Sequence, residues 1–249
     1  LQASGKGMIF SSIQQTTGAK LLFIAEDAET AAYIYNDINR AMPTGSCGLL
    51  PSSYKKSPKH GGLDLASEIM RTDALNIINK KQDNNKINNP QPNNGWLVVT
   101  SPEGLIERVT PQHTFETKRL TIHKGEEIDS EKIIKTLTEW GFEFVEFVYE
   151  PGQYAQRGSI LDIFSFSNER PYRIDFWGDE VESIRVFDIE KQLSINEIDE
   201  INILPNITAK GDKDETVSIF NFLPTDTILC WANMTFAIER MNDIYDDTL

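Results

Sequence analysis

Cysteine is scarce in this sequence, and long apolar runs are absent. The 249 residues include two cysteines, Cys47 and Cys230, which lie far apart in the chain. They form neither a disulfide framework nor a CxxC metal site, so the sequence favours a reducing compartment. No apolar run approaches the length that spans a membrane, and the first residues lack the basic-then-apolar pattern of a signal peptide. We therefore expect a cytoplasmic protein with no membrane partner.

Histidine is also rare, and no catalytic motif is present. The three histidines are scattered without helical metal-ligand spacing: His60, His113 and His123. There is no G-x-S-x-G element and no cysteine–histidine arrangement. Asp162 and Asp175 lie in predicted strands, but nothing pairs them as acid and base. Asp162 stands between Leu161 and Ile163, so we expect a buried carboxylate satisfied by backbone or by an arginine. The sequence thus predicts no catalytic residue, no metal site and no cofactor.

Basic residues are fewer than acidic residues in this sequence. Lys plus Arg number 24 against 38 Asp plus Glu, which gives a net charge of −14. Proteins that bind duplex DNA directly present a basic face, so this balance argues against DNA binding as the main task. One local exception is the segment Ser52–His60, which contains Lys55, Lys56 and Lys59. We interpret it as a solvated loop; direct DNA binding through Lys55–Lys59 is the alternative.

The beginning of the chain contains part of a phosphate-binding motif. Ser4-Gly5-Lys6 resembles the end of the loop G-x-x-x-x-G-K-[ST], but Gly7 stands where a hydroxyl is needed to hold magnesium. We therefore predict a degenerate phosphate loop without enzymatic activity. The alternative is a fragment of an ATP-dependent DNA-repair helicase that uses Lys6.

Residues 1–116 have the pattern of an α/β domain with a parallel sheet. A strand is predicted at 21–25, and Asp27 is placed to cap the helix that follows it. A second helix is predicted at 63–81, a strand at 96–100 and a short helix from Ser101-Pro102-Glu103. Between them, residues 82–94 contain six asparagines, two glutamines and two prolines, a composition typical of a flexible surface insertion.

The pattern changes in residues 117–205, which we predict to be a smaller α+β domain. Strands are expected at 118–123, 142–149 and 201–205, and a helix after Asp129 that stops at Gly141. Residues 206–249 then contain one strand, 227–231, and one helix, 234–245. These two elements cannot bury themselves, so we expect them to return to the first sheet, which makes the α+β domain an insertion.

The strongest strand pattern lies between Pro151 and Asp188. Residues 172–177 and 181–187 are predicted to form a hairpin around Gly178-Asp179-Glu180. One face of the first strand holds apolar side chains, and the other holds polar ones with a tryptophan: Tyr172, Ile174 and Phe176 against Arg173, Asp175 and Trp177. The second face is either the outer side of an ordinary sheet or a protein-binding surface, since Arg and Trp are frequent interface anchors.

Two segments of this region carry a family resemblance. Residues 152–164 (GQYAQRGSILDIF) and 171–188 (PYRIDFWGDEVESIRVFD) closely resemble the amino-terminal module of the bacterial transcription-repair coupling factors, Mfd. That module is similar to part of the excision-repair protein UvrB. Trp177 replaces a residue that is usually phenylalanine in relatives, and Ser165 stands where relatives often have proline. The resemblance covers nearly the whole chain, with the central motif matching best.

The resemblance implies both an architecture and a function. The architecture is a degenerate, helicase-like nucleotide-binding domain interrupted by an inserted domain that binds UvrA, the damage-recognition ATPase. The contacts attributed to this family map onto Arg157, Arg173 and Trp177, and Arg157 is assigned only in this way. The implied function is a non-enzymatic adaptor that recruits nucleotide excision repair to stalled RNA polymerase. The full-length protein is then expected to be an ATP-dependent DNA translocase that binds RNA polymerase, DNA and ATP through downstream domains.

Overall fold

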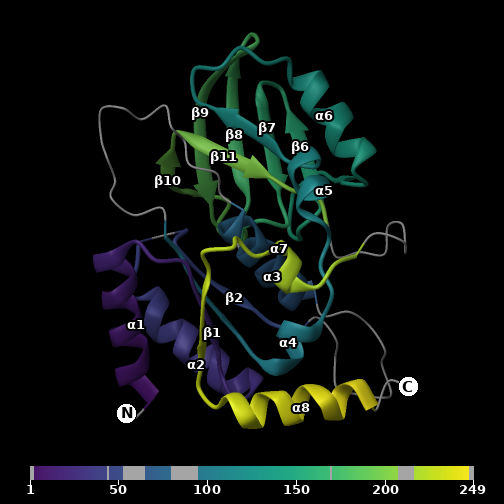
Figure 1. Cartoon of the computed structure of the whole chain (residues 1–249). Coiled ribbons are helices and arrows are strands. Elements are labelled where there is room, and N and C mark those ends of the chain that lie inside the picture. Colours follow the sequence, from purple (N-terminus) through teal and green to yellow (C-terminus); the bar gives the residue numbers. More distant parts are fainter. Residues whose placement is uncertain are drawn as a thin grey trace. The chain divides into compact units, whose positions relative to one another are not determined.

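The chain folds into two units (Figure 1). The computed structural model describes residues 3–43, 45–52, 65–79, 95–168, 170–206 and 216–246. Unit 1 comprises Leu1–Gln112 and Asp212–Leu249, and unit 2 comprises His113–Gly211. The insertion predicted at 82–94 and the lysines at 55, 56 and 59 lie outside the described residues. The chain is thus a mixed α/β structure with one parallel sheet and two further sheets.

The sheet of unit 1 is parallel and has four strands in the order β12-β1-β3-β2. Its strands are β1 (Leu21–Ile24), β2 (Cys47–Leu50), β3 (Leu97–Thr100) and β12 (Ile228–Trp231). All residues of the inner strands β1 and β3 are buried, as expected for a parallel sheet, and so are those of the edge strand β2. Leu21 pairs with Leu97 on one side and with Ile228 on the other, so the carboxy-terminal segment adds a strand to the sheet that the first hundred residues build.

The helices of unit 1 follow the predicted capping signals. They are α1 (Ala3–Thr17), α2 (Ala28–Asn39), α3 (Leu65–Ile78), α4 (Pro102–Ile106), α7 (Ile219–Phe222) and α8 (Met234–Asp246). The Asp27 carboxylate accepts a hydrogen bond from the Thr30 amide at 2.7 Å, and the Ser101 hydroxyl accepts one from the Gly104 amide. The predicted cap at Asp27 is therefore confirmed, and Ser101 is the cap of the short helix that was predicted to start there. In β2, a Cβ at Gly48 would lie 3.1 Å from the Cα of Ala74, so this glycine lets α3 pack closely on the sheet.

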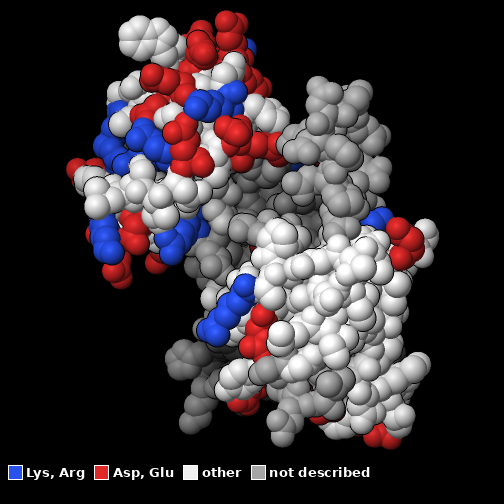
Figure 2. Space-filling view, turned by 90° about the vertical axis from the view of Figure 1, so that its left-hand side faces the viewer, with Lys and Arg blue, Asp and Glu red and all other residues white. Residues whose placement is uncertain are grey.

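One face of unit 1 is weakly charged. Figure 2 shows few Lys, Arg, Asp or Glu side chains on this face of unit 1 and side chains of both signs on unit 2. Helix α1 contributes Met8, Ile9 and Ile13 to the exposed apolar residues of unit 1. The opposite side of the same helix packs into the core, where the ring of Phe10 lies 4.8 Å from the ring of Phe23.

Unit 2 contains a six-stranded sheet in the order β10-β9-β8-β7-β6-β5 and a separate β11-β4 pair. The strands are β4 (Leu120–His123), β5 (Glu143–Phe144), β6 (Gln153–Arg157), β7 (Ile160–Phe164), β8 (Tyr172–Trp177), β9 (Glu180–Phe187), β10 (Ser194–Ile198) and β11 (Glu200–Ile203). All neighbours are antiparallel except β5 and β6. The helices are α5 (Gln112–Thr117) and α6 (Ser130–Glu139). The predicted hairpin is confirmed, with Gly178 at φ 63° in its turn.

Helix α6 covers one face of the large sheet. The Asp129 carboxylate caps it by accepting from the Glu131 amide at 2.8 Å, and Ile133 and Leu137 are its buried residues. The hydroxyls of Thr138 and Tyr154 lie 3.3 Å apart, which places α6 against the side of β6 to which Tyr154 points. The opposite face of the sheet is therefore the one that carries the odd-numbered polar residues of β8.

The strand predicted at 142–149 is wrong for most of its length. Only Glu143–Phe144 pairs with β6, and the chain then leaves the sheet edge. Val148 is fully buried in a small core with Ala155, Phe164 and Phe187, and Val145 packs against that core. The two valines are three residues apart, which matches a bent segment crossing the sheet rather than the two-residue period of a strand.

Candidate functional site

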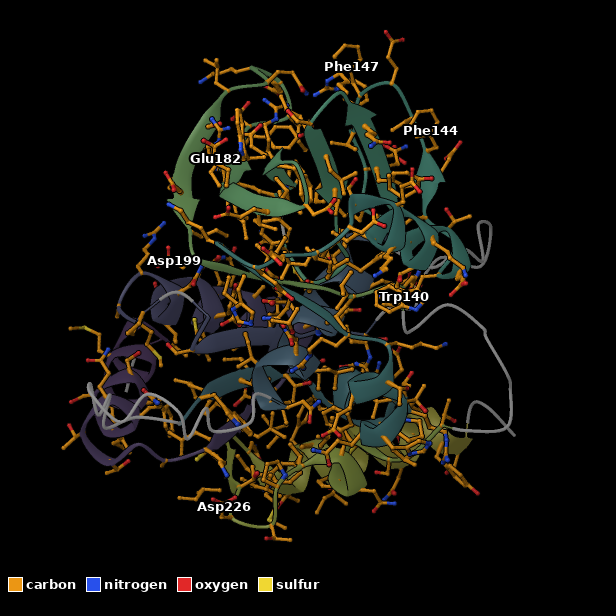
Figure 3. The ribbon with its side chains drawn as sticks, turned by 90° about the horizontal axis from the view of Figure 1, so that it is seen from above. Trp140, Phe144, Phe147, Glu182, Asp199 and Asp226 are labelled. Carbon is orange, nitrogen blue, oxygen red and sulfur yellow. The ribbon has the colours of Figure 1, made fainter. Side chains whose placement is uncertain are left out.

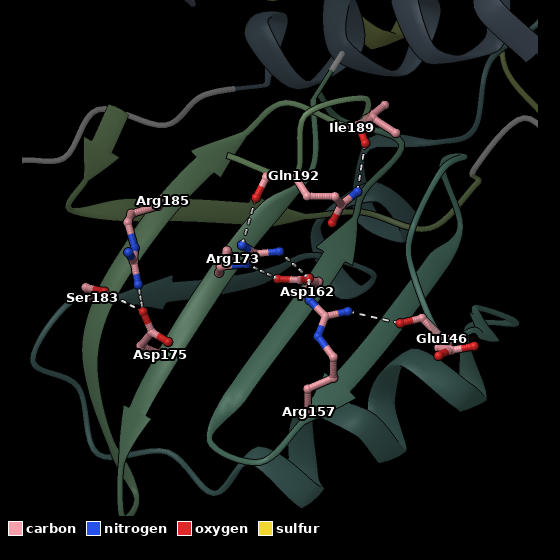
Figure 4. A network of polar contacts seen from close by, with 9 residues as sticks. All are labelled: Glu146, Arg157, Asp162, Arg173, Asp175, Ser183, Arg185, Ile189 and Gln192. Atoms are coloured by element: carbon pink, nitrogen blue, oxygen red, sulfur yellow. Dashed lines mark hydrogen bonds and ion pairs between the residues drawn. The ribbon is translucent and has the colours of Figure 1, made fainter. Parts of the chain in front are cut away.

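A buried carboxylate lies at the centre of the polar face of the large sheet (Figure 4). Asp162 on β7 is 0% exposed and stands directly opposite Arg173 on β8. Arg173 Nε donates to Asp162 Oδ1 at 2.7 Å, and Arg173 Nη2 donates to Oδ2 at 2.8 Å. This two-point geometry is the strongest form of arginine–carboxylate pairing. The prediction that Asp162 is a buried carboxylate satisfied by an arginine is confirmed.

Arg157 on β6 binds the same carboxylate from the other side. Its Nη2 donates to Asp162 Oδ2, and its Nη1 donates to the backbone carbonyl oxygen of Glu146 at 3.0 Å. The guanidinium carbon lies 5.0 Å from the centroid of the Phe147 ring, a cation–π distance. The side chain is 35% exposed, so part of it faces solvent while its tip is held inside the protein.

Arg173 is held more tightly than Arg157. Its Nη1 donates to the Gln192 carbonyl oxygen at 3.3 Å, its guanidinium carbon lies 4.5 Å from the centroid of Phe187, and its side chain is 15% exposed. The hydrogen bond to Asp162 is the main cause that raises the pKa of Arg173 above its usual value. Gln192 reaches this position through a left-handed backbone conformation with φ 56°, which is uncommon for a residue other than glycine.

A second ion pair extends the same face toward β9. Arg185 Nη2 pairs with Asp175 Oδ2, and the Ser183 hydroxyl donates to the same oxygen at 3.2 Å. Both side chains of the pair are partly exposed. The polar face of the sheet is thus a row of internal ion pairs between neighbouring strands.

Trp177 differs from the two arginines because its side chain is almost entirely in solvent. It is 77% exposed and lies at the end of β8, next to the Gly178 turn. A register shift between Asp175 and Phe176 interrupts the ladder with β9 just before it. Irregularities of this kind re-aim the side chains that follow them. The structure therefore brings Arg157 and Arg173 together on Asp162 and leaves Trp177 as an exposed aromatic beyond them.

The incomplete phosphate motif lies inside helix α1. Gly7 is buried, and a Cβ at this position would lie 3.2 Å from the Asp37 Cβ and 3.5 Å from Ile38 Cγ1 on α2. The position that carries a hydroxyl in working phosphate loops therefore faces the packed interface between α1 and α2. The Ser11 hydroxyl donates to the Gly7 carbonyl oxygen at 2.8 Å, which adds to the close packing here.

No three His, Cys, Asp or Glu side chains in the described ranges come together in a group that could hold a metal ion. Among the helices that the structure describes, none is both long and apolar enough to cross a membrane.

Comparison with known proteins concerns the unit that carries this polar face. The sequence model of the UvrB interaction domain matches residues 120–208, which include the whole of the Asp162 network and Trp177. This segment is therefore similar to the UvrB interaction domain. The sheet β5–β10, the β4–β11 pair and helix α6 all lie within it.

The curated relatives are transcription-repair-coupling factors from several bacteria. The Escherichia coli protein is 37% identical over 124 residues, which are 50% of this chain and 11% of the relative. The Haemophilus influenzae protein is 40% identical over 101 residues, 41% of this chain and 9% of the relative. The Bacillus subtilis protein is 27% identical over 206 residues, 82% of this chain and 16% of the relative. The matched region thus spans about a tenth to a sixth of the length of these relatives.

Several contacts of unit 2 carry no sequence signal. The carbonyl groups of Glu146 and Gln192 bind Arg157 and Arg173 through the backbone, which every residue type possesses. Phe147 was placed in a strand by the alternation of aromatic and acidic residues, and its position under Arg157 depends on the bend after Phe144. The alternation of apolar and polar residues along β8 was visible in the sequence, and it correctly placed Arg173, Asp175 and Trp177 on the less buried side of the strand.

Proposed function

We propose that this chain is a non-enzymatic adaptor module that binds UvrA and recruits nucleotide excision repair to stalled RNA polymerase. The observation that carries the proposal is the exposed Trp177, at 77%, on the hairpin of a segment similar to the UvrB interaction domain, in a chain similar to transcription-repair-coupling factors. A large aromatic side chain in solvent contributes nothing to a core, and tryptophan is enriched among the residues that dominate protein interfaces.

The three expected contact residues have different roles in this proposal. Trp177 is the apolar anchor. Arg157 offers its solvent-facing part to the partner while Asp162 and the Glu146 carbonyl hold its tip in place. Arg173 acts mainly as a positioning residue, because its guanidinium is bound to Asp162 and Gln192 and is little exposed. Such fixed side chains lose little conformational freedom on binding.

We further propose the architecture in which this function operates. Residues 1–116 and 206–249 form a degenerate helicase-like domain, and residues 117–205 are the domain inserted into it. The pairing of β12 with β1 supports this arrangement, as does the position of Gly7 against α2, where a side chain in place of the glycine would be tightly packed. In the full-length protein, the DNA translocase activity and the binding of RNA polymerase, DNA and ATP belong to downstream domains.

The proposal is tested by calorimetric titration of UvrA with the 249-residue chain. Trp177→Ala should weaken binding by about 2 kcal/mol, or roughly 30-fold in Kd. Tyr33→Ala is the matched control, because Tyr33 is an aromatic residue of unit 1 with 60% exposure. Equal affinities for the wild type and the folded Trp177→Ala variant would overturn the assignment.

A further inference from the structure

Besides Trp177, three aromatic residues close together in the sequence of unit 2 have exposed side chains. We call them the aromatic row: Phe144, Phe147 and Tyr149, with exposures of 63%, 39% and 59%. Seen from above in Figure 3, Phe144 and Phe147 lie at the periphery of the ribbon. Between them the chain turns Val145 and Val148 toward the small core on the sheet. Val148 is part of this core and Val145 packs against it, while the Phe144 ring lies 5.6 Å from the ring of Tyr154 and the Phe147 ring lies beside Arg157.

The segment that presents the aromatic row is held in place along its length. The Val145 amide donates to the Tyr154 carbonyl oxygen at 2.9 Å. The amides of Tyr149 and Glu150 both donate to the side-chain oxygen of Gln153, at 2.9 and 3.0 Å. At its middle, Arg157 binds the Glu146 carbonyl oxygen. A rigid display of exposed aromatic area is favourable for binding, because little freedom remains to be lost.

The charged side chains within the segment that carries the aromatic row have one sign. Glu143, Glu146 and Glu150 are exposed between the aromatic residues, and residues 142–150 contain no lysine or arginine. Arg157 contacts the segment at Glu146 and Phe147, and Asp162 already binds this arginine. A surface of aromatic side chains separated by carboxylates fits a partner that presents apolar groups between lysines or arginines. Two copies of this chain would bring like charges together here, so self-association is disfavoured.

The aromatic row adjoins the surface already proposed for UvrA. The Arg157 guanidinium lies 5.0 Å from the Phe147 ring centroid, so Phe147 and the exposed part of Arg157 form one continuous area. We propose that the aromatic row is a second contact region for the UvrA partner and that it receives a basic, partly apolar surface of that protein. This inference rests on the proposed function and adds to it the residues 143–150 and the sign of the partner's charge.

The test compares two groups of variants of the 249-residue chain by calorimetric titration with UvrA. The double variant Phe144→Ala/Tyr149→Ala should raise Kd about 10-fold. The triple variant Glu143→Gln/Glu146→Gln/Glu150→Gln should also raise Kd. In addition, Kd of this variant should rise less steeply with NaCl concentration, between about 50 and 300 mM, than Kd of the wild type. Leu193→Ala/Ile195→Ala is the matched control, because these residues are 64% and 48% exposed at the other edge of the same sheet. A thermal melt verifies that each variant is folded.

The outcomes separate this inference from the proposed function. If Trp177→Ala weakens UvrA binding while the aromatic and glutamate variants bind like wild type, the aromatic row is not a contact and the adaptor function stands. If the wild-type chain does not bind UvrA at all, the adaptor function fails and the inference fails with it. Sedimentation that shows self-association abolished by Phe144→Ala/Tyr149→Ala would assign the row to a second copy and overturn the inference.

Discussion

Arg173 and Asp162 face each other across β8 and β7 and form a two-point ion pair in which the carboxylate is fully buried. Removing one partner of a buried pair leaves an uncompensated charge in a region of low polarity. A loss of UvrA binding in an Arg173 variant therefore has two possible origins, a lost contact and a damaged fold. The role of Arg173 must be separated from that of Trp177 by measuring stability together with affinity.

Arg173→Ala should lower the free energy of unfolding by about 3 kcal/mol, which is at the lower end of the usual cost of breaking a buried ion pair. The cost is expected to be this low because Arg157 still binds Asp162 in the variant. The measurement is urea denaturation followed by circular dichroism. Arg185→Ala is the matched control, since its pair with Asp175 is partly exposed, and it should cost about 1 kcal/mol. Equal costs for the two variants would show that burial of Asp162 does not govern the stability of this face.

Trp177 should show the opposite behaviour. Because its side chain is largely in solvent, Trp177→Ala should change the free energy of unfolding by no more than about 0.5 kcal/mol. Trp177→Phe keeps an aromatic surface and should retain most of the UvrA affinity that Trp177→Ala loses. Denaturation and titration of both variants decide this; a large loss of stability in Trp177→Ala would mean that the residue supports the hairpin instead.

Much of the secondary structure could be predicted because its causes are local. The apolar runs at β1 and β3 and the caps at Asp27, Ser101 and Asp129 all depend on a few adjacent residues. Strands β2 and β10 were not predicted. The first is short and contains Gly48, and the second is polar and exposed, so neither shows an alternating or apolar pattern.

The candidate site was predictable only in part, because its geometry depends on distant segments. The flanking apolar residues indicated that Asp162 is buried, but its arginine partners are set by the register of β6, β7 and β8. The prediction of a strand at 142–149 was wrong because Val145 and Val148 both turn toward the small core on the sheet, and their direction is set by packing against that core. Alternation along a segment cannot show such a bend.

The buried thiol of Cys47 makes stability depend on alkaline pH. Burial raises the pKa of Cys47 from its usual value to about 11, with a smaller effect of the same sign from Asp73. The unfolded thiol ionises from about pH 9, whereas the folded thiol stays neutral up to about pH 11. The contribution of the neutral thiol to the free energy of unfolding is therefore fully present below pH 9 and is lost as pH rises through 11. Between pH 8 and pH 10 the free energy of unfolding of the wild type should fall by about 1 kcal/mol more than that of Cys47→Ala. Urea denaturation at pH 8 and pH 10 measures the difference; parallel curves for the two proteins would contradict the assignment.

Gly7 provides a test of the prediction that the phosphate motif is degenerate. Gly7→Thr restores the motif residue, yet its Cβ would stand 3.2 Å from the Asp37 Cβ in the packed α1–α2 interface. We expect the variant to lose about 1 to 2 kcal/mol of stability through overpacking and to gain no ATP binding. Ser12→Thr is the control, because Ser12 is exposed on the same helix and the change adds the same β-branched side chain there. Thermal melts and equilibrium dialysis with ATP measure the two effects. Micromolar ATP binding by Gly7→Thr that Lys6→Ala removes would show that only the hydroxyl is missing and would favour the helicase alternative.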